Sequence, residues 1–329
     1  MATFSIIKLT HLSPIHLGTG REATDSSAHI LHSDTLSAAL AAMRVQTQGA
    51  EGIKEFIESF VISSAFPFWH DHLYLPKPQG RIPVTVKGRE ESQVRKTLKG
   101  IQYIESTLWN LLIEGKTINV DEHQIQHHIL SDASPKGGIP VFSRSQVNER
   151  VSVPRQEGED TEPFFFEWNY YDQNAGLYVL TDAKADLLQE LHSLFILLGE
   201  QGIGTDRNVG GGKFDVEDAG TIELGVSEEK SNAQMLLSLF IPTQECLLSL
   251  HLEESTYSLL PRGGFMAGSN NESFRHLHKK SVYMFNTGSV FKATAPLQGK
   301  VVDLRPNWDS EEMHPVYRSG RPLSVPIYI

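Results

Sequence analysis

The order of the predicted elements along the chain indicates an α+β fold in two domains. Strand and helix patterns between residues 1 and 227 follow the order β-α-β-β-α-β, which is the ferredoxin-like plan. A glycine-rich stretch lies between the last helix and the last strand of this plan. After a polar linker at residues 228–233, an apolar strand begins at Gln234 and opens a second domain, residues 234–329. The chain is long enough for each domain to bury a core of its own.

The first half of the plan begins with a strand at residues 4–9. A helix follows, and Ser33 or Asp34 is its predicted N-cap because either side chain can accept a hydrogen bond from the first turn. The residues at helical spacing that should face inward are Leu36, Ala39, Leu40 and Met43. A second helix is predicted near residues 53–60.

Two apolar runs follow these helices, at residues 60–68 and 72–75. Their alternation and the polar residues between them predict a β-hairpin. His70 and His72 would then share one strand face at a sheet edge, with Asp71 on the other.

A long insertion is predicted at residues 84–163. It contains one expected helix near residues 93–113 and a segment at residues 134–155 that proline and glycine interrupt. Because charged and turn residues are frequent in it, we expect the insertion to lie outside the core.

Strand patterns return at residues 164–171 and 176–180, with residues 172–174 as the turn between them. The next helix is predicted to begin after Asp182 as its N-cap. Its apolar face would carry Leu187, Leu188, Leu191, Leu194, Phe195 and Leu198. Alternation from Lys213 onward indicates the final strand of the first domain.

The glycine loop between this helix and strand, residues 202–214, reads GIGTDRNVGGGKF, and five of its thirteen residues are glycine. Glycine permits positive φ and lets the backbone approach a bound group closely. The loop also carries Arg207 and Lys213. We therefore predict a mobile loop rich in donors that follows the backbone of a long anion such as RNA. The alternative is a helix end followed by a flexible connection.

The position of the glycine loop argues against the common nucleotide motifs. A dinucleotide fingerprint requires strand, glycines and then helix, whereas this loop follows a helix and precedes a strand. A P-loop would require a glycine five residues before Gly212 and a hydroxyl side chain after Lys213. Those positions hold Arg207 and Phe214.

Composition and charge narrow the class of protein. The 329 residues include one cysteine, which excludes a disulfide framework and suits a reducing cytoplasm. No apolar run approaches the length that crosses a membrane. The net charge of −11 is unusual for a protein that binds nucleic acid. The charges are segregated along the chain, however: acidic residues concentrate at 157–162 and 215–229, and basic residues at 77–99. Segregation fits an RNA path on one side, although residues 77–99 fit a solvated loop and helix equally well.

Few residues suggest catalysis or a metal. His123 and His127 have the spacing of one helix face, but no third metal ligand lies nearby. The chain has no Gly-x-Ser-x-Gly elbow and no Gly-Gly-Asp-Asp sequence. Metal-independent RNA cleavage stays an alternative, since His16 could act as general base while Arg207 or Lys213 stabilises the phosphorane. We expect no catalytic residue, no metal and no cofactor.

Several motifs together resemble a known family. They are SPIHLGTG (residues 13–20), HSDTLSAAL (residues 32–40), the glycine loop, KKSVYMFNTGSVF (residues 279–291) and HPVYRSGRPL (residues 314–323). The glycine loop is similar to the signature of the RAMP superfamily of CRISPR systems. The combination resembles the family of the fourth subunit of the type III-A (Csm) effector complex, over most of the chain outside residues 84–139.

The resemblance implies a function in antiviral defence. Members of that family are RNA-binding subunits that cap the 5′ end of the guide RNA (crRNA) and hold its repeat-derived tag. The implied partners are crRNA, the large polymerase-like subunit and the backbone RAMP subunit, in the cytoplasm and without a membrane. The resemblance, with a weak internal repeat, also implies that the second domain is a degenerate ferredoxin-like (RRM-like) unit.

Residues 141–155 resemble the projecting thumb of the family. Within this segment Phe142 could wedge between bases or pack under the hairpin, and the second role is slightly favoured. Residue chemistry and resemblance together give the predicted RNA-binding set: His16, Gly18, Ser33, Arg144, Asn148, Arg150, Arg155, Gly202, Gly204, Arg207, Gly210, Gly211, Gly212, Lys213, Arg262, Gly263 and Gly264.

Overall fold

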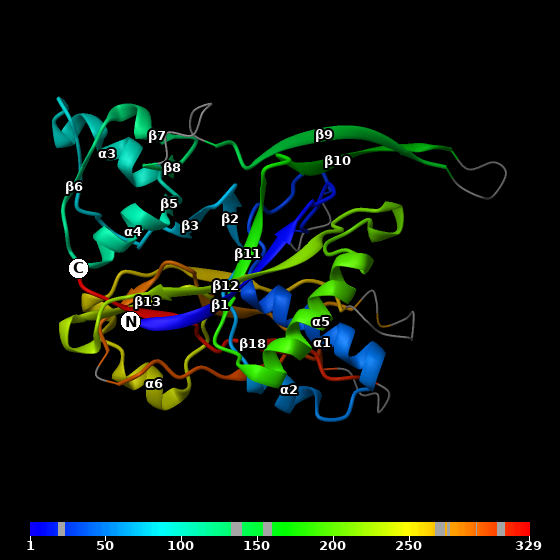
Figure 1. Cartoon of the computed structure of the whole chain (residues 1–329). Coiled ribbons are helices and arrows are strands. Elements are labelled where there is room, and N and C mark those ends of the chain that lie inside the picture. The colour runs from blue at the N-terminus through cyan, green and yellow to red at the C-terminus, as the bar shows by residue number, and fades with distance from the viewer. Residues whose placement is uncertain are drawn as a thin grey trace.

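The computed structural model describes residues 1–18, 24–132, 140–153, 160–266, 274, 277–293, 295–307 and 313–329. Its largest element is an eight-stranded mixed sheet with the order β12-β1-β11-β2-β3-β5-β8-β7 (Figure 1). The strands are β1 (Ala2–Thr10), β2 (Phe66–Trp69), β3 (His72–Pro76), β5 (Tyr103–Glu105), β7 (Ile125–Gln126), β8 (Ile129–Leu130), β11 (Ala175–Thr181) and β12 (Asp215–Leu224).

The first four strands of that order pair antiparallel. Helices α1 (Ser33–Gln48) and α2 (Ile53–Ser59) connect β1 to β2, and α5 (Ala185–Gln201) connects β11 to β12. This is the β-α-β-β-α-β order expected for the first domain.

Alternation along the strands separates two cores, because successive side chains point to opposite sheet faces. Ile7 of β1 and Val179 of β11 face the helices, where they pack with Leu40 of α1 and Phe195 of α5. Ile6 lies in the opposite core. Figure 1 shows the three helices together on one side of the sheet.

The predicted helix caps are wrong. His32 is the N-cap of α1, so Ser33 and Asp34 lie in the first turn. Lys184 is the N-cap of α5, and neither cap residue makes a side-chain cap bond. Asp182 accepts a hydrogen bond from the Val61 amide at 3.2 Å.

Residues 84–130 of the insertion are part of the core, which corrects the prediction that the insertion lies outside it. Its expected single helix is two helices, α3 (Glu91–Gly100) and α4 (Ser106–Ile113), separated by β5 of the main sheet. Strands β4 (Val84–Val86) and β6 (Ile118–Val120) pair in parallel beside them. Trp109 of α4 is fully buried, in one cluster with Leu224 and Ile327.

The end of the predicted insertion and the residues that follow it form a long two-stranded ribbon. Strand β9 (Ser143–Ser152) pairs antiparallel with β10 (Glu162–Tyr171) over ten residues. The ribbon projects away from the body of the molecule as an arm (Figure 1). The turn at Asp172 is present, with its carbonyl accepting from the Ala175 amide at 3.0 Å. Strands β10 and β11 belong to different sheets.

The second half consists of small sheets. Strand β13 (Ala233–Leu236) pairs with β16 (Val290–Phe291) and β19 (Ser324–Ile327), while β14 (Leu259–Arg262) pairs with β15 (Val282–Phe285) and β17 (Val301–Asp303) with β18 (Tyr317–Ser319). Helix α6 (Gln244–Ser249) is short, and four 3-10 turns complete the described elements: η1 (Glu122–Gln124), η2 (Arg207–Val209), η3 (Glu228–Lys230) and η4 (Leu252–Glu254). A second ferredoxin-like domain is not confirmed. No helix in the described part of the chain is both long and apolar enough to cross a membrane.

Candidate nucleic-acid interface

The glycine loop is held tightly by backbone hydrogen bonds. The amide of Ile203 donates to the carbonyl of Gly212 at 2.9 Å, and the amide of Gly212 donates to that of Pro14 at 2.9 Å. The amide of Thr205 donates to the carbonyl of His16 at 3.0 Å. These amides are therefore used within the protein, and the predicted mobile, donor-rich loop is replaced by an ordered one.

Close packing explains why glycine occupies these positions. Gly212 has a φ of +68°, and a Cβ there would lie 1.8 Å from the carbonyl oxygen of Ile203. A Cβ on Gly204 would lie 2.3 Å from the carbonyl oxygen of His16. A Cβ on Gly202 would lie 2.4 Å from the carbonyl oxygen of Gly211. The glycines thus let the loop pack against itself and against the segment around His16.

The cations of the loop remain at the surface. Arg207, at the start of η2, and Lys213 are both exposed. Ser13 fixes the backbone beneath them, since its hydroxyl donates to the Gly210 carbonyl at 2.8 Å and accepts from the Lys213 amide at 2.7 Å. The loop is therefore a rigid mount for two exposed positive charges.

Arg150 joins the ribbon to the glycine loop. Its guanidinium binds the carboxylate of Asp206 and lies 4.5 Å from the ring centre of Phe166 and 5.4 Å from that of Trp168. Trp168 in turn packs against Gly211, where a Cβ would lie 2.7 Å from the indole. Arg150 is thus engaged within the protein, so it is not a free phosphate ligand.

The other predicted ribbon residues differ in accessibility. Arg144 is exposed and lies opposite Tyr170, while Asn148 is partly buried and lies opposite Phe166. Arg155 lies outside the described residues. Phe142 packs on Tyr74, with ring centres 4.9 Å apart, as expected for the packing role.

His16 is buried with 2% of its surface exposed. Its Nδ1 is 2.8 Å from the carbonyl oxygen of Glu167, and its ring centre is 4.4 Å from that of Phe166. In this structure His16 packs the ribbon onto the body, and its predicted RNA contact stays a prediction. Gly18 is exposed and bridges to Ser27.

Ser33 and Arg262 both bond to groups within the protein. Ser33 is buried, and its hydroxyl accepts from the Leu239 amide at 2.9 Å. Arg262 makes a two-pronged ion pair with Asp34, with Nε–Oδ2 at 2.9 Å and Nη2–Oδ1 at 3.0 Å. Both side chains are thus used within the protein, and their predicted RNA contacts stay predictions.

The glycines next to Arg262 also serve packing. A Cβ on Gly263 would lie 2.6 Å from the Ser281 hydroxyl. Gly264 has a φ of +103°, and its carbonyl accepts from the Lys279 amide at 3.1 Å. Residues 262–264, which combine a cation with two glycines as the glycine loop does, therefore form an internal contact, here called the joint.

Five residues around this joint form the Asp34 cluster: Asp34, Arg262, Arg318, Lys279 and His32. Arg318 adds a second guanidinium, with Nη1 3.1 Å from the carbonyl oxygen of Asp34 and 3.5 Å from its Oδ2. Asp34 is fully buried, and despite that burial the charges of Arg318 and Arg262 hold its pKa below the ordinary value. Residue type alone could not have revealed this cluster.

The flanking members of the Asp34 cluster have shifted pKa values. Burial, with the charge of Arg262, lowers the pKa of His32 to about 4. Burial, followed by the charge of Arg318, lowers the pKa of Lys279 to about 8. His32 is therefore neutral near pH 7, whereas Lys279 still carries most of its charge.

The basic stretch at residues 77–99 is partly neutralised. Arg81 pairs with Glu91, and Lys87 pairs with Asp121 at 2.9 Å. Arg89 pairs with Glu122 at 2.9 Å. These pairs favour the solvated-surface interpretation of this stretch.

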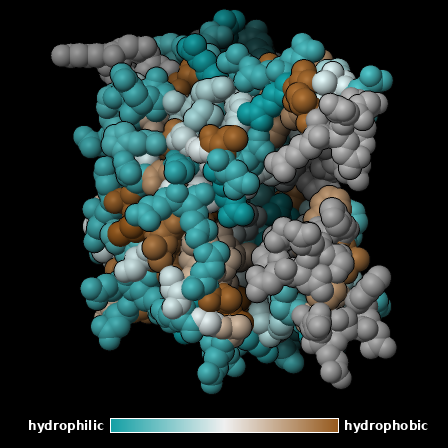
Figure 2. Space-filling view, turned by 90° about the vertical axis from the view of Figure 1, so that its right-hand side faces the viewer, coloured by the Kyte–Doolittle hydropathy of each residue, from teal (hydrophilic) through white to brown (hydrophobic). Residues whose placement is uncertain are grey.

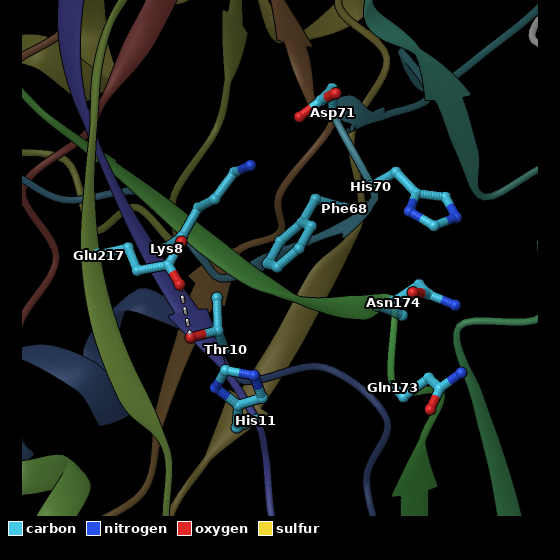
Figure 3. Close-up of a pocket in the computed structure, with 10 residues that line it drawn as sticks. Lys8, Thr10, His11, Phe68, His70, Asp71, Gln173, Asn174 and Glu217 are labelled. Atoms are coloured by element: carbon cyan, nitrogen blue, oxygen red, sulfur yellow. Dashed lines mark hydrogen bonds between the residues drawn. The ribbon is translucent and has the colours of Figure 1, made fainter.

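An open pocket of about 290 Å³ lies on the sheet near the base of the ribbon (Figure 3). Lys8 of β1 crosses it, with Nζ 4.6 Å from the ring centre of Phe68. His70 and Asp71 form the turn between β2 and β3, and His70 has a φ of +51°. His70 and His72 therefore do not share a strand face, contrary to the prediction.

The proposed histidine helix does not form. His123 lies in the short turn η1, and His127 follows β7 with a φ of +52°. Within the described ranges no group of three potential ligands could hold a metal ion.

The face in Figure 2 is mainly hydrophilic, with small separate hydrophobic groups.

The sequence comparisons all find similarity to Csm4 proteins of CRISPR systems. Residues 229–327 match the model of the CRISPR Csm4 C-terminal domain. The chain is 24% identical to the Csm4 protein of the CRISPR system of Thermococcus onnurineus, over 83% of this chain and 88% of the relative. It is 21% identical to the corresponding Csm4 protein of Methanocaldococcus jannaschii, over 95% and 94% of the two chains.

Solved structures share the fold of the whole chain. A chain from a Csm1–Csm4 cassette in complex with cA4 superposes with a TM-score of 0.63 at 18% identity, over 100% of this chain and 99% of the other. A chain from a Csm3–Csm4 subcomplex of a type III-A interference complex gives a TM-score of 0.62 at 17% identity, over 99% and 100%.

Proposed function

We propose that this chain is a Csm4-type subunit of a type III CRISPR complex, as its match to the Csm4 C-terminal domain and its similarity to two Csm4 proteins suggest, and that it holds the 5′ tag of crRNA without cleaving it. The observation that carries the proposal is the pair of exposed cations, Arg207 and Lys213, on an ordered loop beside the ribbon. Two fixed positive charges match two phosphates of a single strand. Exposed Arg144 extends the basic path along the ribbon.

The proposed partners follow from the solved relatives, which are named as complexes of Csm4 with Csm1 and with Csm3. We infer that this chain bridges a large polymerase-like subunit to the backbone RAMP subunit. Copurification of the three subunits tests this inference, and a chain that binds neither partner would contradict it.

Catalysis by this chain is disfavoured by the position of His16. A general base must reach the 2′-hydroxyl proton, directly or through a water. His16 is buried, and its Nδ1 is hydrogen-bonded to the carbonyl of Glu167. The alternative, a metal-independent endoribonuclease that processes CRISPR repeat RNA, therefore requires the ribbon to move.

The test is binding of labelled 5′-tag RNA across a salt series, with the chain alone and with its large partner, and with cleavage scored on the same gel. We expect intact RNA and affinity that falls with salt. The double variant Arg207→Ala with Lys213→Ala should reduce the slope of log K against log salt by about 1.4, because each phosphate contact on a single strand contributes about 0.7.

The matched control is Lys230→Ala with Lys300→Ala, which removes two exposed charges elsewhere. Equal losses in the two double variants would show that net charge, not the loop, determines binding. Cleaved RNA that becomes intact with His16→Ala would establish the endoribonuclease instead.

A further inference from the structure

The Asp34 cluster contains more positive than negative charge. Arg262, Arg318 and Lys279 are three cations, and Asp34 is the one carboxylate that the described residues place among them. His32 adds no charge near pH 7. Three positive charges and one negative charge leave two positive charges without a counter-charge. Partly buried charge without a counter-charge is unfavourable, so an anion at this position would be stabilising.

Polar atoms of the cluster also lack partners. Nδ1 of His32 and Nε of Arg318 are buried and form no hydrogen bond with the described residues. His32 is 9% exposed, and the side chain of Arg318 is 12% exposed. Buried polar atoms are nearly always satisfied, so such atoms point to a bound ion or water. Arg318 Nε–H is a donor, which an oxyanion can accept.

The cluster can be reached from solvent. The side chain of Arg262 is 23% exposed, and Lys279 is partly buried. The site is therefore neither a sealed core nor an open surface.

We propose that Arg262, Arg318 and Lys279 form a binding site for a phosphate group, where helix α1 meets strands β14 and β18. Guanidinium groups match the oxygens of phosphate in geometry, and the lysine adds a point charge. A phosphate group carries a charge of about −1.5 to −2 near pH 7, which balances the two excess positive charges. Asp34 positions the two arginines and does not contact the anion.

The lowered pKa of Lys279 predicts a pH dependence. The groups that face it are Arg318, Arg262 and Asp34, and of these the two arginines lower its pKa. A bound phosphate raises that pKa, since an opposite charge favours the charged form. Above the pKa of the free site, affinity should fall by roughly tenfold per pH unit as the lysine loses its proton.

The experiment titrates the full chain with inorganic phosphate at constant ionic strength, with sodium chloride as the balancing salt. We expect saturable binding by calorimetry and a midpoint of thermal unfolding that rises by several degrees at about 100 times the dissociation constant. Lys279→Met should abolish both effects, and Lys280→Met, at the exposed neighbouring lysine, should preserve them. Lys279→Arg should retain binding and shift the loss of affinity to higher pH.

Absence of saturable binding by the wild-type chain would overturn the proposal. Equal behaviour of Lys279→Met and Lys280→Met, with native circular dichroism for both, would also overturn it. Because this titration contains no RNA, its result is independent of the proposed tag binding.

Competition identifies the source of the phosphate once binding is found. A short RNA with a 5′-phosphate is compared with the same RNA carrying a 5′-hydroxyl. Displacement of phosphate by the first alone indicates a terminal phosphate, and displacement by both indicates a backbone phosphodiester. Displacement by neither indicates the free ion, and each of these outcomes supports the site.

Discussion

Two segments of the molecule combine cations with glycines: the glycine loop at residues 202–214 and the joint at residues 262–264. In the first, Arg207 and Lys213 are exposed above a tightly bonded backbone. In the second, Arg262 binds buried Asp34 from another part of the chain. The same residue types therefore present charge to solvent in one place and hold two halves of the protein together in the other.

The deciding factor is the position of the nearest carboxylate. Asp206 lies within the glycine loop, but it pairs with Arg150 of the ribbon and leaves Arg207 exposed. Asp34 lies in the first turn of α1, where burial makes its ion pairs essential. A cation beside a glycine is thus left without an ion pair only where no carboxylate faces it.

The largest expected effect comes from removing that acid. Asp34→Asn leaves the guanidiniums of Arg262 and Arg318 without a counter-charge, and should lower the free energy of unfolding by about 3 to 5 kcal/mol. Urea denaturation measures the change. Asp206→Asn is the control, because it breaks a partly exposed pair and should cost less than about 1 kcal/mol. Comparable losses in both variants would remove the distinction between the segments.

An intermediate effect is expected from pH. Histidine has an ordinary pKa of 6.5, and burial lowers that of His32 to about 4. Below pH 6.5 the unfolded chain binds a proton that the folded protein does not bind. The free energy of unfolding is therefore unaffected by His32 above pH 6.5. It falls by up to about 3 kcal/mol as the pH is lowered to about 4.

The variant His32→Gln isolates this contribution. Its free energy of unfolding should depend less steeply on pH between 6.5 and 4 than that of the wild-type chain. Unfolding curves recorded through this range provide the comparison. Parallel pH profiles would mean that His32 is not protected from protonation.

The smallest effect separates two glycines of the loop. Gly210 and Gly212 both have positive φ, but a Cβ on Gly210 meets no atom within 4 Å, whereas one on Gly212 overlaps the carbonyl of Ile203. Both alanine variants carry the cost of positive φ. Gly212→Ala should therefore be less stable than Gly210→Ala by about 1 to 3 kcal/mol, as measured by urea denaturation. Equal stabilities would show that the loop can relax.

Periodicity in the sequence predicted the buried faces of α1 and α5 well. Leu36 and Leu40 of α1, and Leu191 and Leu198 of α5, are buried as their spacing indicated. Local patterns are sufficient here because each helix presents one apolar face to the sheet. The position of the glycine loop between helix and strand was predicted for the same reason.

The candidate site was less predictable because it depends on distant contacts. Arg262 and Asp34 are 228 positions apart, so no local sequence pattern could predict that they form an ion pair. His16 was expected to face RNA, but the ribbon covers it. The insertion contains many charges, yet Trp109 packs in a cluster with Ile327. Burial in these cases is set by tertiary pairing and not by residue type.

The place of β1 between β11 and β12 limits the order in which the chain can fold. Its neighbours are β11 (residues 175–181) and β12 (residues 215–224), so β1 cannot pair until more than half of the chain is available. Contacts between distant segments require costly loop closure and form slowly. During synthesis β1 therefore stays without its partner strands until residues 175–181 are made. Helices α1 and α2 are the first elements that can cover its apolar face.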